Sequence, residues 1–148
     1  MIIWQKFLLI LLAVYSIVGF IKGLRESKNK KNPFGETKFF TPLGAFVWGD
    51  MVIFGVFWWL ISLVILYLND WILFLLIFSV FWTVRSFGET TYWFLQQFSV
   101  VNRNPPEKFW HFKIFKNDSV WFVNQIFWQC VTTVSLISTI YLAKIWFQ

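Results

Sequence analysis

The sequence has few charges, one cysteine and one histidine. Only 14% of its 148 residues are charged, whereas a soluble domain carries about a quarter. The single cysteine, Cys130, excludes an intramolecular disulfide and any metal site built from several thiolates. The single histidine, His111, limits metal chemistry in the same way. We therefore predict no metal ion and no cofactor.

Common catalytic motifs are also missing. The chain has no phosphate-binding loop, no zinc-protease His-Glu-x-x-His, no Cys-x-x-Cys and no Gly-x-Ser-x-Gly. These absences favour a protein that is not an enzyme. A lipid-modifying enzyme that uses Glu89, Asp50 and His111 as acid-base groups remains an alternative.

Apolar residues, in contrast, are abundant. Hydrophobic residues make up 58% of the chain and aromatic residues 24%, and the mean hydropathy is +0.62. A soluble domain of this size could not bury so much apolar surface. A spanning helix needs about 20 apolar residues. The sequence therefore predicts one all-α membrane domain, residues 1–148, whose four transmembrane helices cover approximately residues 2–21, 43–68, 71–98 and 120–143.

Two basic segments set the expected orientation. Residues 22–42 and 99–118 hold most of the Lys and Arg, whereas the turn between the second and third helices has none. By the positive-inside rule, both segments are cytoplasmic and both termini lie outside. A basic segment next to a membrane is attracted to anionic lipid headgroups.

The second basic segment alternates aromatic and basic residues. Near residues 105–116 this pattern predicts a short segment lying in the membrane interface. Its expected headgroup contacts are Lys108, Trp110, Lys113 and Lys116. Stacking on single-stranded nucleic acid is the other use of such a pattern, but beside a membrane we expect no nucleic-acid partner.

Three ionisable residues interrupt the apolar stretches. Arg85 and Glu89 are four residues apart and share a helix face. Counted from Asp70, they lie about 22 and 28 Å along the helix. A hairpin folded at Asn69-Asp70 would place Asp50 opposite Glu89, so the three side chains could form one cluster. Such a cluster holds two helices in register, lies solvated at the level of the lipid headgroups, or marks an ion, proton or substrate path.

The fourth helix carries a polar face. It consists of amide and hydroxyl side chains within an apolar stretch: Asn124, Gln125, Gln129 and Thr132. In hydrocarbon such side chains usually hydrogen-bond to another helix. We expect a helix-helix contact, within the chain or with a partner, and a pore lining is the alternative.

Local signals predict where helices begin and turn. Thr41-Pro42 has the composition of an N-cap followed by the first residue of the second helix. Asn69-Asp70 predicts a tight turn between the second and third helices.

These features favour a small non-enzymatic membrane protein, a scaffold or accessory subunit of a larger membrane complex. Its partners would be the bilayer and another membrane protein or a second copy of the chain. The alternative is a small oligomeric transporter, or an ion or proton channel, that uses Asp50, Arg85 and Glu89.

Overall fold

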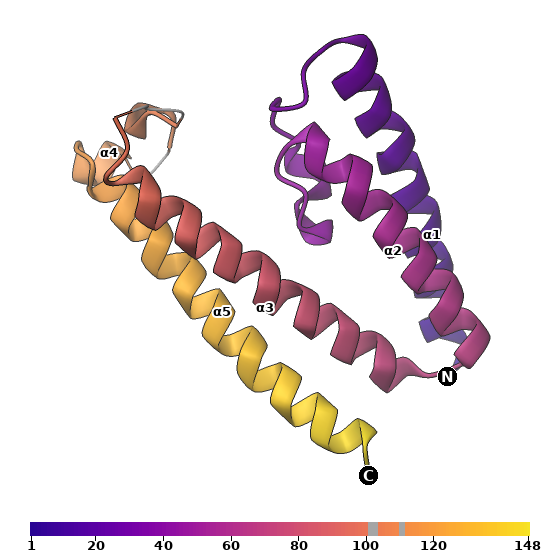
Figure 1. Ribbon diagram of the computed structural model, residues 1–148. Coiled ribbons are helices and arrows are strands. Elements are labelled where there is room, and N and C mark those ends of the chain that lie inside the picture. Colours follow the sequence, from indigo (N-terminus) through magenta and orange to yellow (C-terminus); the bar gives the residue numbers. More distant parts are fainter. Residues whose placement is uncertain (101–103, 110–111) are drawn as a thin grey trace. The chain divides into compact units, whose positions relative to one another are not determined.

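The computed structural model describes residues 1–100, 104–109 and 112–148. Its regular elements are helices, and the chain divides into two compact units, Met1–Leu75 and Leu76–Gln148 (Figure 1). Within these residues, four helices are long and apolar enough to cross a membrane. They are α1 (Ile3–Leu24), α2 (Trp48–Leu68), α3 (Trp71–Gln96) and α5 (Ser119–Trp146). This confirms the predicted all-α membrane architecture.

Short helical turns lie between these spans. The π-helix η1 (Arg25–Asn29) prolongs α1 into the first basic segment, and the 3-10 helix η2 (Lys38–Leu43) precedes α2. The 3-10 turn η3 (Pro106–Lys108) and the four-residue α4 (Phe112–Phe115) lie in the second basic segment. The interfacial segment expected near residues 105–116 thus has only these two short turns in its described part.

Small residues let α1 and α2 pack closely in the first unit. An added Cβ at Gly55 would lie 2.9 Å from both the Ser16 carbonyl oxygen and the Phe20 Cβ. At Gly19 it would lie 2.6 Å from the Met51 Cε. Close packing through small residues is how helices associate in lipid, where hydrophobic burial gives little drive.

The start of α2 differs from the prediction. Pro42 lies inside η2, and α2 begins five residues later than expected, at Trp48. Gly44, with φ 75°, follows η2 in the left-handed conformation and ends that turn. The carboxylate of Asp50 then accepts bonds from the amides of Phe46 and Val47. The prediction that Thr41-Pro42 caps α2 is therefore wrong, because the N-cap is Val47 and Asp50, in the first turn of the helix, makes the capping-box bond back to its amide.

The turn after α2 follows the prediction. Asn69 adopts the left-handed conformation, φ 56°, and its amide donates to the Ile65 carbonyl. The Asp70 carboxylate accepts from the Leu73 amide at 3.0 Å and so caps the first turn of α3. At the same end, the rings of Trp4 and Trp71 meet edge to face with centroids 5.4 Å apart. The predicted turn at Asn69-Asp70 is therefore confirmed, and Asp70 in addition caps α3.

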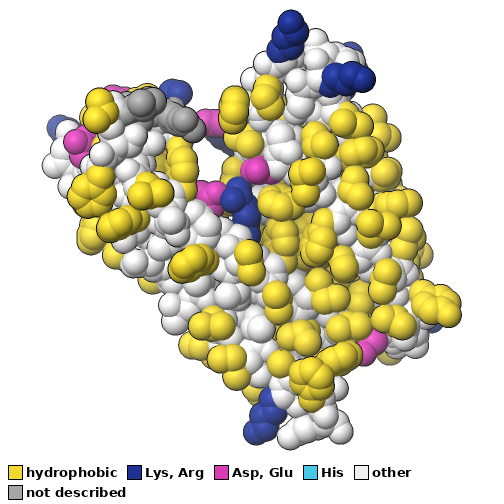
Figure 2. Space-filling view, in the orientation of Figure 1, with side chains coloured by type: hydrophobic (Ala, Val, Ile, Leu, Met, Phe, Trp, Pro, Cys, Tyr) yellow, Lys and Arg dark blue, Asp and Glu magenta, His cyan; other side chains and the backbone are white. Residues whose placement is uncertain are grey.

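The second unit is built on α3 and α5, which run side by side (Figure 1). α3 continues without a break through Gly88, and the rings of Trp82 and Trp128 stack at 6.4 Å between the two helices. Over both units, apolar side chains cover the helix surfaces, as Figure 2 shows. In the same view, Lys and Arg side chains gather at the end of the first unit where α1 ends. A helix pair that spans a membrane needs this distribution, because its apolar side chains face lipid and its charged side chains lie at the membrane boundary.

Candidate functional site

Arg85 and Glu89 form an ion pair on α3. The Arg85 Nη1 and the Glu89 Oε1 are 2.8 Å apart, and the side chains are only 17% and 14% exposed. One helical turn separates them, so the pair is formed within a single element. It lies 14 to 18 residues after the start of α3, about 21 to 27 Å along the helix. The structure thus places two ionised side chains together, largely shielded, within a candidate span.

Asp50 is the third member of the predicted cluster. It lies in the first turn of α2, half-buried, and its Oδ2 accepts from the Phe46 amide at 3.0 Å and the Val47 amide at 3.3 Å. These bonds satisfy backbone donors at the start of the helix. Asp50 belongs to the first unit and the ion pair to the second. A shared cluster of all three residues therefore stays a prediction.

Two residues of the predicted polar face of α5 bond to α3 or to Gln97, the residue that follows it. Gln97 Nε2 donates to Gln125 Oε1 at 2.7 Å, and Thr132 Oγ1 donates to Ser86 Oγ at 2.9 Å. Asn124 has a buried Nδ2 with no hydrogen-bond acceptor among the described residues. Gln125 and Thr132 of the predicted polar face therefore take part in a contact between helices of the second unit.

The contact extends through hydroxyl groups on both helices. Ser79 donates to the Ser135 carbonyl at 2.8 Å, and Thr139 donates to Ser79 at 3.0 Å. Thr83 and Thr139 hydroxyls lie 3.4 Å apart. From Ser79 to Ser86 along α3, the hydrogen-bond partner on α5 moves backward from Thr139 to Thr132. The two helices are therefore antiparallel.

The sequence analysis did not identify the α3 residues that form these hydrogen bonds. The signal was present, since Ser79, Thr83, Ser86 and Thr90 recur every three or four residues and share one face.

Gln129 differs from its neighbours on α5. Its side chain is exposed, as are those of Cys130 and Thr133. It is the eleventh residue of α5, about 15 Å from the start of the helix. No hydrogen bond joins the Gln129 side chain to a described residue, although its backbone carbonyl accepts from the Thr133 hydroxyl at 3.0 Å. An amide at this depth is therefore left facing outward.

The predicted headgroup contacts fall in the segment between α3 and α5. Lys108, Lys113 and Lys116 are exposed. Trp110, and with it His111, lies outside the described residues. The three lysines are therefore accessible to headgroups, and contact with lipid stays a prediction.

Asn104 anchors this segment to both helices. Its Nδ2 donates to the Tyr92 hydroxyl at 2.5 Å, and its carbonyl accepts from the Trp121 Nε1 at 2.9 Å. Phe109 lies edge to face against Trp93 at 5.3 Å. Asn104 thus links the segment to both α3 and α5.

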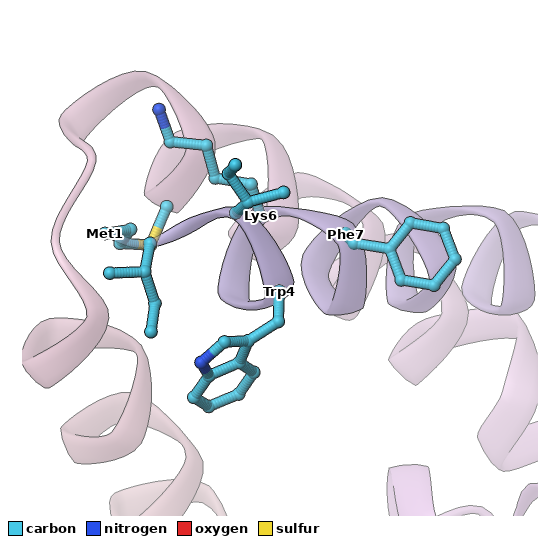
Figure 3. Close-up of a pocket in the computed structure, with 6 residues that line it drawn as sticks. Met1, Trp4, Lys6 and Phe7 are labelled. Carbon is cyan, nitrogen blue, oxygen red and sulfur yellow. The ribbon is translucent and has the colours of Figure 1, made fainter.

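A surface hollow surrounds the first turns of α1. Its lining comes from neighbouring residues of a single helix start: Met1, Ile2, Ile3, Trp4, Lys6 and Phe7. The side chains of Trp4, Lys6 and Phe7 point in different directions (Figure 3). Polar groups do not converge there, so the hollow lacks the features of a binding site.

Fold and side chains together define a class, a polytopic helical membrane protein with an ion pair inside one candidate span. Comparison of the chain with family models, with curated proteins and with solved structures gave no match. Function must therefore be argued from the side chains themselves.

Proposed function

We propose that the protein is a non-enzymatic scaffold or accessory subunit that docks on another membrane protein through α5. The observation that carries the proposal is the exposed Gln129 side chain near the middle of that helix. In lipid, an amide without a partner loses the hydrogen bonds that water would give it. A polar side chain of a facing helix supplies them.

The neighbours of Gln129 support such a contact. Cys130 and Thr133 are small, exposed residues beside it, and Ile126 is exposed one turn before it and Ile137 about two turns after it. Small residues allow a second helix to approach, and the isoleucines provide apolar packing around the amide. The Thr132 side of α5 is already used by α3, so the two contacts use different sides of the helix.

The test is purification from native membranes in lipid nanodiscs, followed by intact mass measurement. We expect a stoichiometric second protein that Gln129→Leu releases. Val134→Leu is the matched control, because Val134 is 65% exposed on the same helix and has no polar group. Retention of the partner by the Gln129→Leu variant, or purification of a lone monomer, would contradict the proposal.

The Arg85–Glu89 pair favours a second candidate function. Ionisable side chains within a span often mark ion or proton paths. In this reading the chain oligomerises as a small transporter or channel, Asp50 or Glu89 exchanges a proton or cation, and Arg85 balances the charge of the acid. A homo-oligomer without a second protein would favour this candidate.

Ion flux through reconstituted vesicles tests the transporter candidate. We expect conductance that Glu89→Gln abolishes and that Glu107→Gln leaves unchanged, since Glu107 is exposed in the segment before α5. Vesicles that leak no more than protein-free vesicles would rule this candidate out.

The proposal also includes an orientation. Both termini lie outside and the two basic segments face the cytoplasm, where they meet anionic headgroups. The charge distribution of the sequence supports this orientation.

A further inference from the structure

The segment between η1 and α2 does not stay at the end of the helices. The level of that end is marked by Lys22 and Trp48, since the Lys22 Nζ lies 5.0 Å from the centre of the Trp48 ring. Lys22 also ends the apolar run of α1. Tryptophan and lysine side chains typically lie together at the membrane boundary.

Phe39 and Leu43 of this segment bond to residues that lie further along the helices, away from the level of Lys22 and Trp48. The Tyr15 hydroxyl donates to the Phe39 carbonyl, and the Trp58 Nε1 donates to the Leu43 carbonyl at 3.1 Å. Tyr15 precedes Lys22 by seven residues, about 10 Å of helix, and Trp58 follows Trp48 by ten residues, about 15 Å. The segment therefore descends roughly 10 Å along the helices and returns.

Packing holds the descending part between the helices. Phe40 is 2% exposed, and its ring centre lies 4.9 Å from that of Tyr15. An added Cβ at Gly19 would lie 2.8 Å from the Phe40 ring, so the glycine leaves room for the phenylalanine. Leu43 and Ala45 are buried beside it. The segment is thus an integral part of the first unit.

Backbone groups of the segment are bonded within the protein. The Thr37 amide donates to the Phe46 carbonyl at 2.8 Å, and the Gly44 amide to the Thr41 carbonyl at 2.8 Å. On the way back, the Trp48 amide donates to the Gly35 carbonyl at 3.0 Å. Irregular backbone at membrane depth is tolerated only where such bonds replace water.

The composition of the segment agrees with this depth. Residues 39–49 contain no charged side chain. An uncharged stretch of this length is too short to span a bilayer and is typical of a re-entrant segment. The basic residues of the first segment, apart from Lys38, lie before Pro33.

We propose that residues 38–46 form a re-entrant segment that enters and leaves the membrane on one side, with Phe39 in contact with lipid acyl chains. Phe39 is 73% exposed although its carbonyl is bonded at the level of Tyr15. An exposed aromatic ring at that depth meets hydrocarbon. Lys38 is also exposed, and its long side chain extends toward the headgroups.

Spin-label accessibility tests the proposal in the full chain. In a Cys130→Ala background, a nitroxide is attached to Phe39→Cys or to Phe34→Cys, and collisions with oxygen and with a water-soluble nickel chelate are compared in liposomes. Phe34 is the matched control, because it is an equally aromatic residue, 84% exposed. Its neighbour Pro33 accepts from the Gly49 amide at 2.8 Å, which places it at the helix end.

We expect the ratio of oxygen to nickel collisions to be several-fold higher at position 39 than at position 34, and equal to that of Val14→Cys on the exposed face of α1. A ratio at position 39 no higher than at position 34 would overturn the proposal. Trp58→Phe removes the bond to Leu43 and should lower the ratio at position 39. If that variant does not fold, the comparison of positions 39 and 34 in the otherwise unchanged chain still decides.

Discussion

At the scale of single residues, Asp50 shows that one side chain can have two interpretations. The sequence suggested a charge for an ion path, and the structure shows a carboxylate that caps α2. Capping needs an acceptor oxygen and gains little from the full charge. The two roles therefore respond differently to substitution.

We predict that Asp50→Ala lowers the free energy of unfolding by about 1 to 2 kcal/mol, whereas Asp50→Asn costs much less. Asparagine keeps an acceptor oxygen at the same place. Thermal unfolding in detergent micelles measures both variants. Equal stability of the alanine variant and the unchanged chain would show that the cap contributes nothing. If Asp50→Asn abolishes ion flux without loss of stability, the charge itself has a function.

Two tryptophans near helix ends do not face the lipid headgroups, where this residue is commonly found in membrane proteins. Trp93, near the end of α3, and Trp121, near the start of α5, are each only 7% exposed. Trp121 donates to the Asn104 carbonyl and Trp93 packs on Phe109. The polar partner of Trp121 is therefore the protein's own backbone, whereas the buried Nε1 of Trp93 has no hydrogen-bond acceptor among the described residues.

At the scale of elements, helix pairs associate through small and hydroxyl-bearing residues. The first unit uses Gly19, Gly55 and Ser16, and the second uses serine and threonine side chains on both helices. Both solutions bring backbones close without large apolar side chains between them. Replacing a small residue by a larger one should therefore lower the stability of a helix pair only where the added atoms would collide with a neighbouring residue.

Gly55→Ala should destabilise the protein, because the new Cβ would lie 2.9 Å from the Ser16 carbonyl oxygen, a backbone atom that cannot easily move. Gly88→Ala is the control, since no described atom lies within 4 Å of its Cβ position. That variant should be as stable as the unchanged chain or more stable, by up to about 1 kcal/mol, because alanine favours helices. Thermal unfolding compares the two. The opposite order would show that α1 and α2 are not in contact at Gly55.

The bond between Ser86 and Thr132 should couple the two helices energetically. In a double-mutant cycle with Ser86→Ala and Thr132→Val, we expect a coupling energy of about 0.6 kcal/mol, and not more than about 1.7. Unfolding in bicelles with a steric trap gives the four free energies. Strict additivity would mean that the hydroxyls, 2.9 Å apart, do not contribute to association.

At the scale of the whole molecule, the distribution of basic residues predicts one topology. Single cysteines at Lys30 or Lys113, in a Cys130→Ala background, should react with an impermeant maleimide only from the cytoplasmic side. A cysteine at Asn69 should react only from outside. Whole cells and inverted vesicles give the two sides. Labelling of Lys30→Cys and Asn69→Cys from the same side would refute the four-span topology.

Composition and the spacing of apolar stretches are sufficient to predict the class of fold. Four long apolar stretches separated by charged or turn-forming residues allow only spanning helices, because lipid offers the backbone no hydrogen bonds. The Asn69-Asp70 turn and the Arg85–Glu89 pairing also follow from local spacing. Such features involve residues close together in the chain, where helix geometry fixes their distance.

Tertiary structure decided what depends on distant residues. The start of α2 was predicted at Leu43. In the structure Phe40 packs against Gly19, and the Leu43 carbonyl accepts from the Trp58 Nε1. These contacts with distant residues hold residues 38–43 in a 3-10 turn before α2. The hydrogen bonds that hydroxyl groups form between α3 and α5 depend on the register of the two helices, which the sequence does not specify. Local patterns give the propensity of a segment to be helical or apolar, but only packing between segments determines which backbone and side-chain groups satisfy one another.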